Sequence, residues 1–182
     1  MKLNKKDEHF LIKKLNGFFQ KDDWNYLHTI KTAKFMKKIC DKTGTNEKIL
    51  MTTAYLHDIG YSKLIKKNYS LKERINAKKE HMEIGAKLAE PILRKLNYSK
   101  EEIKEVLRLI KVHDKLNNLK EENDFLIFEA DSLGGLATRE NSAFTQTELN
   151  QYIKIFKRKR LPLIKSNFGK KEVVKLLNKY KK

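Results

Sequence analysis

Imidazole and carboxylate groups occupy inward positions of helix-like segments in this chain. An apolar stripe at helical spacing passes through Leu50 and Ala54 and is continued by His57, which Asp58 follows directly before Gly60. Polar groups at such positions are costly to bury without partners. The fold must therefore supply partners for these side chains, which limits how the helices can be arranged.

Three further histidines and one aspartate share this pattern on other helix-like segments. The ordered set is His28, His57, Asp58, His81, His113 and Asp131. Any one of these histidines alone is more simply a core residue satisfied by hydrogen bonds, but one or two cations would satisfy the whole set together. Nitrogen and oxygen ligands without thiolate suit a divalent Mn, Fe, Co, Ni or Zn ion, and the sequence does not choose among them. His9 has no partner motif and is interpreted as a surface residue.

The rest of the sequence predicts a single all-α domain. Seven glycines and two prolines in 182 residues favour a helix-rich protein, and this length suits one well-buried core. Helices are predicted at about 7–20, 23–43, 46–57, 81–96, 100–113, 125–131, 145–160 and 170–180, with a loop and a short helix at 61–79. Gly134-Gly135 are expected to weaken the helix after Asp131. The domain core is predicted at about 24–140, followed by basic C-terminal helices at about 145–182.

The net charge of +18 is concentrated near the C-terminus. From Lys154 to Lys182 there are twelve basic residues and one acidic residue, and Lys157–Arg160 is the one dense run. Lysines that keep helix faces solvated are favoured over a specific nucleic-acid surface, which stays open as an alternative. No apolar run approaches the roughly 20 residues of a membrane span, and no secretory signal is visible, so a cytoplasmic protein without a membrane partner is expected. The single Cys40 is expected in the core.

His28, His57-Asp58 and Asp131, in this order, resemble the HD superfamily of metal-dependent phosphohydrolases. His57-Asp58-Ile59-Gly60 matches the frequent His-Asp-Ile-Gly form, and the resemblance covers about residues 28–139. It implies an all-α HD-domain helical bundle, here with extra C-terminal helices. The positions of His28, His57, Asp58 and Asp131 bind metal in one-metal members. Two-metal members also bind metal through the positions of His81 and His113, and the residue at the position of Asp58 bridges the two ions.

The resemblance also implies the hydrolysis of a small phosphorylated substrate by a metal-activated water, with Asp58 as the catalytic residue. A nucleotide is the leading candidate substrate, and Lys63 and Arg139 are the candidate phosphate contacts. Many two-metal members carry lysine directly after the His-Asp-x-Gly run, whereas this chain has Tyr61. The alternatives are a one-metal site in which His81 and His113 contact substrate, or a nucleic-acid-binding or regulatory protein whose metal site is structural or vestigial. The oligomeric state is left open.

Overall fold

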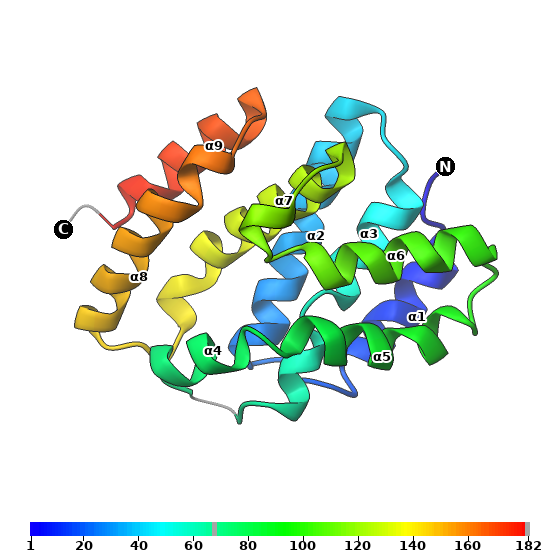
Figure 1. The fold of residues 1–182 in the computed structure, drawn as a ribbon, viewed down its shortest axis with the longest axis horizontal. Helices are drawn as coiled ribbons and strands as arrows, with labels where there is room; N and C mark the ends of the chain where they lie inside the picture. The colour runs from blue at the N-terminus through cyan, green and yellow to red at the C-terminus, as the bar shows by residue number, and fades with distance from the viewer. Residues whose placement is uncertain (67–68, 181–182) are drawn as a thin grey trace.

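The chain is all-helical in the part that the structure describes. A computed structural model describes residues 1–66 and 69–180, apart from the side chain of residue 140, and these residues contain no strand (Figure 1). The α-helices are α1 (Lys5–Leu15), α2 (Trp24–Thr43), α3 (Glu47–Leu56), α4 (Leu71–Ala77), α5 (His81–Leu93), α6 (Lys100–Val112), α7 (Glu122–Thr138), α8 (Gln146–Lys159) and α9 (Asn167–Asn178). The 3₁₀ turns are η1 (Ile59–Lys63), η2 (Leu116–Asn118), η3 (Arg139–Asn141) and η4 (Leu161–Leu163). The predicted all-α class is confirmed.

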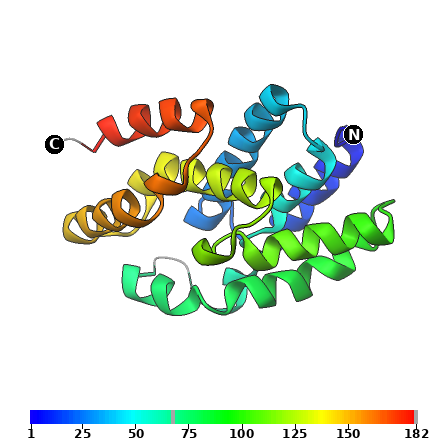
Figure 2. The ribbon, with the colours of Figure 1, turned by 45° about the horizontal axis from the view of Figure 1, so that its top comes forward.

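Helices α2 and α7 form the centre of the molecule and lie side by side. The hairpin of α5 and α6 lies on one side of this pair, and α8 and α9 lie on the other, with α9 packed against α7 (Figures 1 and 2). Residues 181–182 of the predicted basic C-terminal segment lie outside the described residues. No helix in the described ranges is long and apolar enough to cross a membrane.

Local capping signals set the ends of the helices that carry the site. The Asp23 carboxylate accepts a hydrogen bond from the backbone N–H of Asn25 at the start of α2, and Gly44 ends that helix in the left-handed conformation with a φ of 68°. Ser99 and Glu102 form a capping box at the start of α6. The first helix ends at Leu15, five residues earlier than predicted, because the chain turns at Asn16 and the following glycine.

Helix α7 differs from the sequence-based prediction. The pair Gly134-Gly135 was expected to weaken it after Asp131, but the helix continues to Thr138. Gly134 faces α2 so closely that an added Cβ would lie 2.2 Å from the Thr32 hydroxyl oxygen. Glycine costs about 1 kcal/mol relative to alanine inside a helix, and here the close packing of α2 against α7 offsets that cost. This close approach brings the helices of His28 and Asp131 together.

The apolar side chains of the helices form one core cluster around α2, α3 and α7. Cys40 belongs to it and is buried, as predicted.

Candidate metal centre

The six predicted ligands come together in one buried cluster. They come from α2 (His28), the residues directly after α3 (His57, Asp58), the first residue of α5 (His81), the residue after α6 (His113) and α7 (Asp131). None of the six is more than 8% exposed. Residues separated by more than a hundred positions therefore meet in the interior, where polar groups need compensation.

The first half of the cluster combines two histidines with two carboxylates. The Nε2 atom of His28 lies 3.0 Å from Asp131 Oδ1 and 3.3 Å from Asp58 Oδ2. The Nε2 atom of His57 lies 3.5 Å from each of the same two oxygens. The two Nε2 atoms are 3.1 Å apart.

The second half of the cluster uses the other oxygen of Asp58. The Nε2 atoms of His81 and His113 each lie 3.4 Å from Asp58 Oδ1 and are 3.3 Å from each other. Asp58 is thus shared, with Oδ2 facing one pair of imidazoles and Oδ1 facing the other.

Backbone hydrogen bonds hold three of the imidazoles in a ligating orientation. The Nδ1 atoms of His57, His81 and His113 each lie 2.8–2.9 Å from the carbonyl oxygen of the residue three positions earlier. Because a carbonyl only accepts, Nδ1 carries the proton, and a neutral ring then presents the lone pair of Nε2 to the cluster. The ring of His28 is positioned by stacking on Trp24, with 4.7 Å between ring centroids.

This donor set fits one or two divalent ions. His28, His57, Asp58 and Asp131 form one group whose ligand atoms all lie within 4.8 Å of one another, and Asp58, His81 and His113 form a second. Facing Nε2 lone pairs repel each other unless a cation or a proton lies between them. Imidazole and carboxylate together suit the transition-metal ions expected from the sequence.

The carboxylates of the cluster stabilise a positive charge on His57. Burial acts to lower the pKa of His57, but the neighbouring Asp58 and Asp131 carboxylates outweigh it and raise the pKa to about 9. Burial acts in the opposite sense on Asp58, yet the surrounding histidines, led by His57, hold its pKa well below the usual range. The cavity therefore favours ionised carboxylates and a positive charge between them.

Gly60 and Tyr61 fix the position of His81. A Cβ at Gly60 would lie 2.0 Å from the carbonyl oxygen of His81, so only glycine lets η1 lie this close to the start of α5. The ring of Tyr61 stacks on His81 with 4.1 Å between centroids and 12° between planes. The residue that replaces the expected lysine is therefore a buried support for His81.

Arg74 of α4 supplies a cation beside Asp58. Its Nη2 donates to Asp58 Oδ2 at 3.2 Å, and its guanidinium lies 4.2 Å from the Tyr61 ring centroid and 4.4 Å from that of Trp24. Arg74 lies in the segment 61–79, for which a loop and a short helix were predicted, and the structure forms this helix as α4. The available signal was the capping box of Ser70 and Glu73, which starts α4 and orients it.

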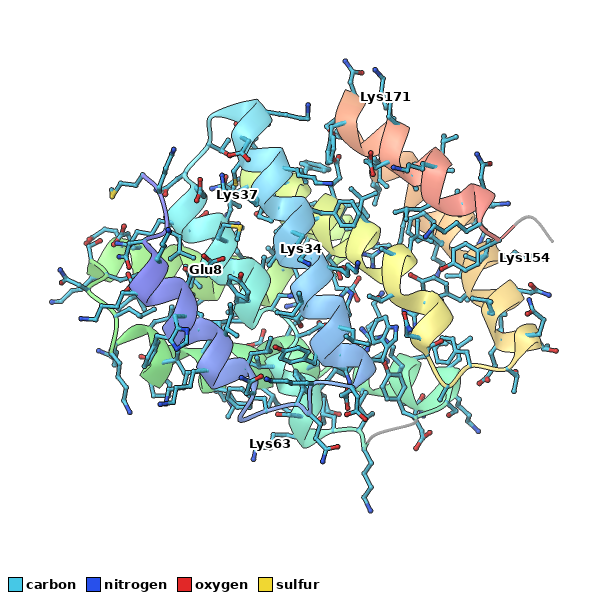
Figure 3. The ribbon with its side chains drawn as sticks, turned by 180° about the vertical axis from the view of Figure 1, so that it is seen from behind. Glu8, Lys34, Lys37, Lys63, Lys154 and Lys171 are labelled. Carbon is cyan, nitrogen blue, oxygen red and sulfur yellow. The ribbon has the colours of Figure 1, made fainter. Side chains whose placement is uncertain are left out.

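The two predicted phosphate contacts lie in different places. Lys63 is exposed at the periphery of the molecule and does not line the cavity next to the metal ligands (Figure 3). Arg139 does line that cavity and is only 2% exposed. Among the described residues, the structure thus brings Arg139, but not Lys63, to the site.

Arg160 is a site residue that the sequence did not indicate. It belongs to the dense basic run at 157–160, but its side chain turns inward and hydrogen-bonds to Asp131, to Asp114 at 2.6 Å and to Ser132 at 3.0 Å. Lys154 and Lys171 of the same basic region lie on the outer surface (Figure 3). The basic run is therefore not a uniformly exposed patch.

A cavity of about 130 Å³ opens beside the metal ligands. Its walls combine metal ligands with three arginines and several aromatic rings. Among its lining residues are Trp24, His28, Asp58, Tyr61, Arg74, His113, Asp131, Arg139, Tyr152 and Arg160.

The fold and this cluster define a helical protein with a candidate divalent-metal centre, and comparison with known proteins supplies the family. A model of the HD domain matches residues 25–136, more than half of the chain, so the chain belongs to the HD-domain family. This membership places it in a superfamily of metal-dependent hydrolases, as its sequence indicated.

A solved structure supports the fold. The chain is similar to a predicted HD superfamily hydrolase from an uncultured Thermotogales bacterium, with a TM-score of 0.61 and 14% sequence identity over 93% of this chain and 88% of the other. At this identity the likeness concerns the fold alone. No curated protein sequence gives a significant match.

Proposed function

We propose that the protein is a metal-dependent phosphohydrolase that acts on a small phosphorylated substrate, with a nucleotide as the leading candidate. The observation that carries the proposal is the shared Asp58 carboxylate. Its two oxygens face two separate pairs of imidazole Nε2 atoms, at 3.3–3.5 Å. A carboxylate in this position is suited to join two ions, and such pairs of ions commonly serve phosphoryl chemistry.

The donor set assigns a role to each ligand in the proposed site. His28, His57, Asp58 and Asp131 would hold a first ion, and Asp58, His81 and His113 a second. Mn, Fe, Co, Ni and Zn are the candidates. When bound, the ions would activate a water and neutralise charge on the phosphoryl oxygens.

The protein side chains would orient the substrate and exclude bulk water. Asp58 is the proposed catalytic residue, because it touches both halves of the site and Arg74 holds one of its oxygens. Arg160 orients Asp131 and supplies a second positive charge at the wall of the cavity. The positive charge of this guanidinium would attract the negatively charged phosphoryl oxygens.

Removal of metal tests the proposal directly. The purified protein is expected to contain divalent metal and to hydrolyse a generic phosphodiester or a member of a nucleotide panel. After chelation the rate should fall to background, and one of the candidate ions should restore it, because the ions would supply the activated water that attacks the phosphoryl group. Metal content is measured by elemental analysis and hydrolysis by product release. A metal-loaded protein inactive on the whole panel, or hydrolysis that survives complete chelation, would contradict the proposal.

The number of ions is tested through the second pair of histidines. His81→Ala and His113→Ala are each expected to lower bound metal from two ions toward one per chain, because each removes one of three ligands of the second group. The exposed His9 provides the control, and His9→Ala should leave the stoichiometry unchanged. If both site variants keep the metal content of the unaltered protein, the one-metal alternative is favoured.

A further inference from the structure

Arg139 is a buried guanidinium without hydrogen-bond partners for two of its nitrogens. It is 2% exposed, and among the described residues nothing accepts a hydrogen bond from its Nε or Nη1. Arg74 and Arg160, the other arginines of the cavity, each donate to a carboxylate of the metal cluster. Buried N–H donors that lack acceptors are costly, so the donors of Arg139 call for a ligand that accepts from them.

Aromatic rings hold this guanidinium in place. Its central carbon lies 4.1 Å from the ring centroids of Trp24 and Tyr152 and 4.8 Å from that of Phe144. Such cation–π contacts fix the plane of the group but leave its N–H donors unsatisfied. The side chain is therefore packed between aromatic rings while two of its donors lack an acceptor.

The Arg139 side chain lines the cavity that contains the candidate metal ligands. Trp24 forms part of this wall, because its ring contacts both the His28 imidazole and the Arg139 guanidinium. A ligand at Arg139 would therefore lie in the same enclosed space as a phosphoryl group at Asp58. The cavity, at about 130 Å³, is smaller than the roughly 300–1,000 Å³ of typical small-molecule pockets, so its enclosed part suits compact anionic groups.

We propose that Arg139 binds a second anionic group of the substrate, so that the site takes a compact substrate with one anionic group at the metal ligands and another at Arg139. This inference rests on the proposed function. The second group is a phosphate, as in a diphosphate, or a carboxylate, because guanidinium N–H groups donate charge-assisted hydrogen bonds to either.

Three non-hydrolysable probes separate these possibilities. Methylphosphonate carries one anionic group, phosphonoacetate adds a carboxylate, and methylenediphosphonate adds a second phosphonate. Their binding to metal-loaded protein is measured by calorimetry at a fixed free-metal concentration. At least one two-anion probe is expected to bind about tenfold or more tightly than methylphosphonate, and the tighter of the two identifies the second group. Equal affinities for all three probes would overturn the proposal.

Variants of Arg139 assign the preference to this residue. Arg139→Met should abolish the preference for two anions, and Arg139→Lys should keep part of it, while the metal content of both stays unchanged. Chelation of free metal by the probes affects every variant equally. Arg94 is exposed and ion-paired with Glu90, so Arg94→Met is the matched control and should keep the full preference. A preference that persists in Arg139→Met would overturn the proposal.

The outcomes also distinguish this inference from the proposed function. Binding needs no turnover, so a two-anion preference lost in Arg139→Met would support the inference even if no substrate were hydrolysed. Hydrolysis together with equal affinities for the three probes would support the proposed function and overturn only the role of Arg139.

Discussion

Asp58→Asn is expected to lower kcat/KM for phosphoester hydrolysis by roughly 10³-fold, the equivalent of about 4 kcal/mol of transition-state stabilisation. The substitution keeps the shape of the side chain but removes the negative charge that four imidazole Nε2 atoms and Arg74 surround. Both candidate ions share this carboxylate, so the amount of metal bound by each of the two ligand groups should fall. Elemental analysis and hydrolysis rates on the same preparations provide the measurement.

The control for Asp58→Asn is another buried aspartate outside the site. Asp124 is 1% exposed and accepts a hydrogen bond from Arg108 at 2.7 Å. Asp124→Asn should lower stability yet retain the metal and the activity, because Asp124 has no contact with the cluster ligands. If Asp58→Asn kept full metal content and full hydrolysis, Asp58 would not be the catalytic residue.

Arg160→Met is expected to lower the free energy of unfolding of the metal-free protein by about 3 kcal/mol. The substitution leaves Asp131 and Asp114 without the guanidinium that joins them and that lies 4.6 Å from the Phe128 ring. Burial acts to raise the pKa of Asp131, and Arg160 is the largest influence that lowers it. In the variant this carboxylate should take up a proton more readily, which also weakens metal binding.

The control for Arg160→Met lies two positions earlier in the same basic run. Arg158 is exposed, and Arg158→Met should change the free energy of unfolding by no more than about 0.5 kcal/mol. Chemical denaturation followed by circular dichroism measures both variants. Equal stability of the two variants would mean that the inward position of Arg160 contributes nothing to the fold.

The sequence indicated most of the helices and the six candidate ligand residues. Helix ends depend on local chemistry, so Asp23, Gly44 and the Ser99 capping box could be recognised without knowledge of the fold. The His-Asp pair could be recognised because His57 continues an apolar stripe and thus points inward. These features depend on neighbours within a few residues of one another.

The tertiary structure decided which charged residues surround the ligands. Arg74, Arg139 and Arg160 look like many other basic residues in a chain of net charge +18. A capping box marks the start of the helix that carries Arg74, but no local pattern shows that these arginines reach the cluster and that Lys63 does not. The positions of these arginines depend on how α4, η3 and the C-terminal end of α8 lie against α2 and α7. That arrangement results from contacts between residues far apart in the chain. Local spacing specifies the helical face on which a side chain lies, whereas its charged neighbours across the cavity are set only when the helices pack.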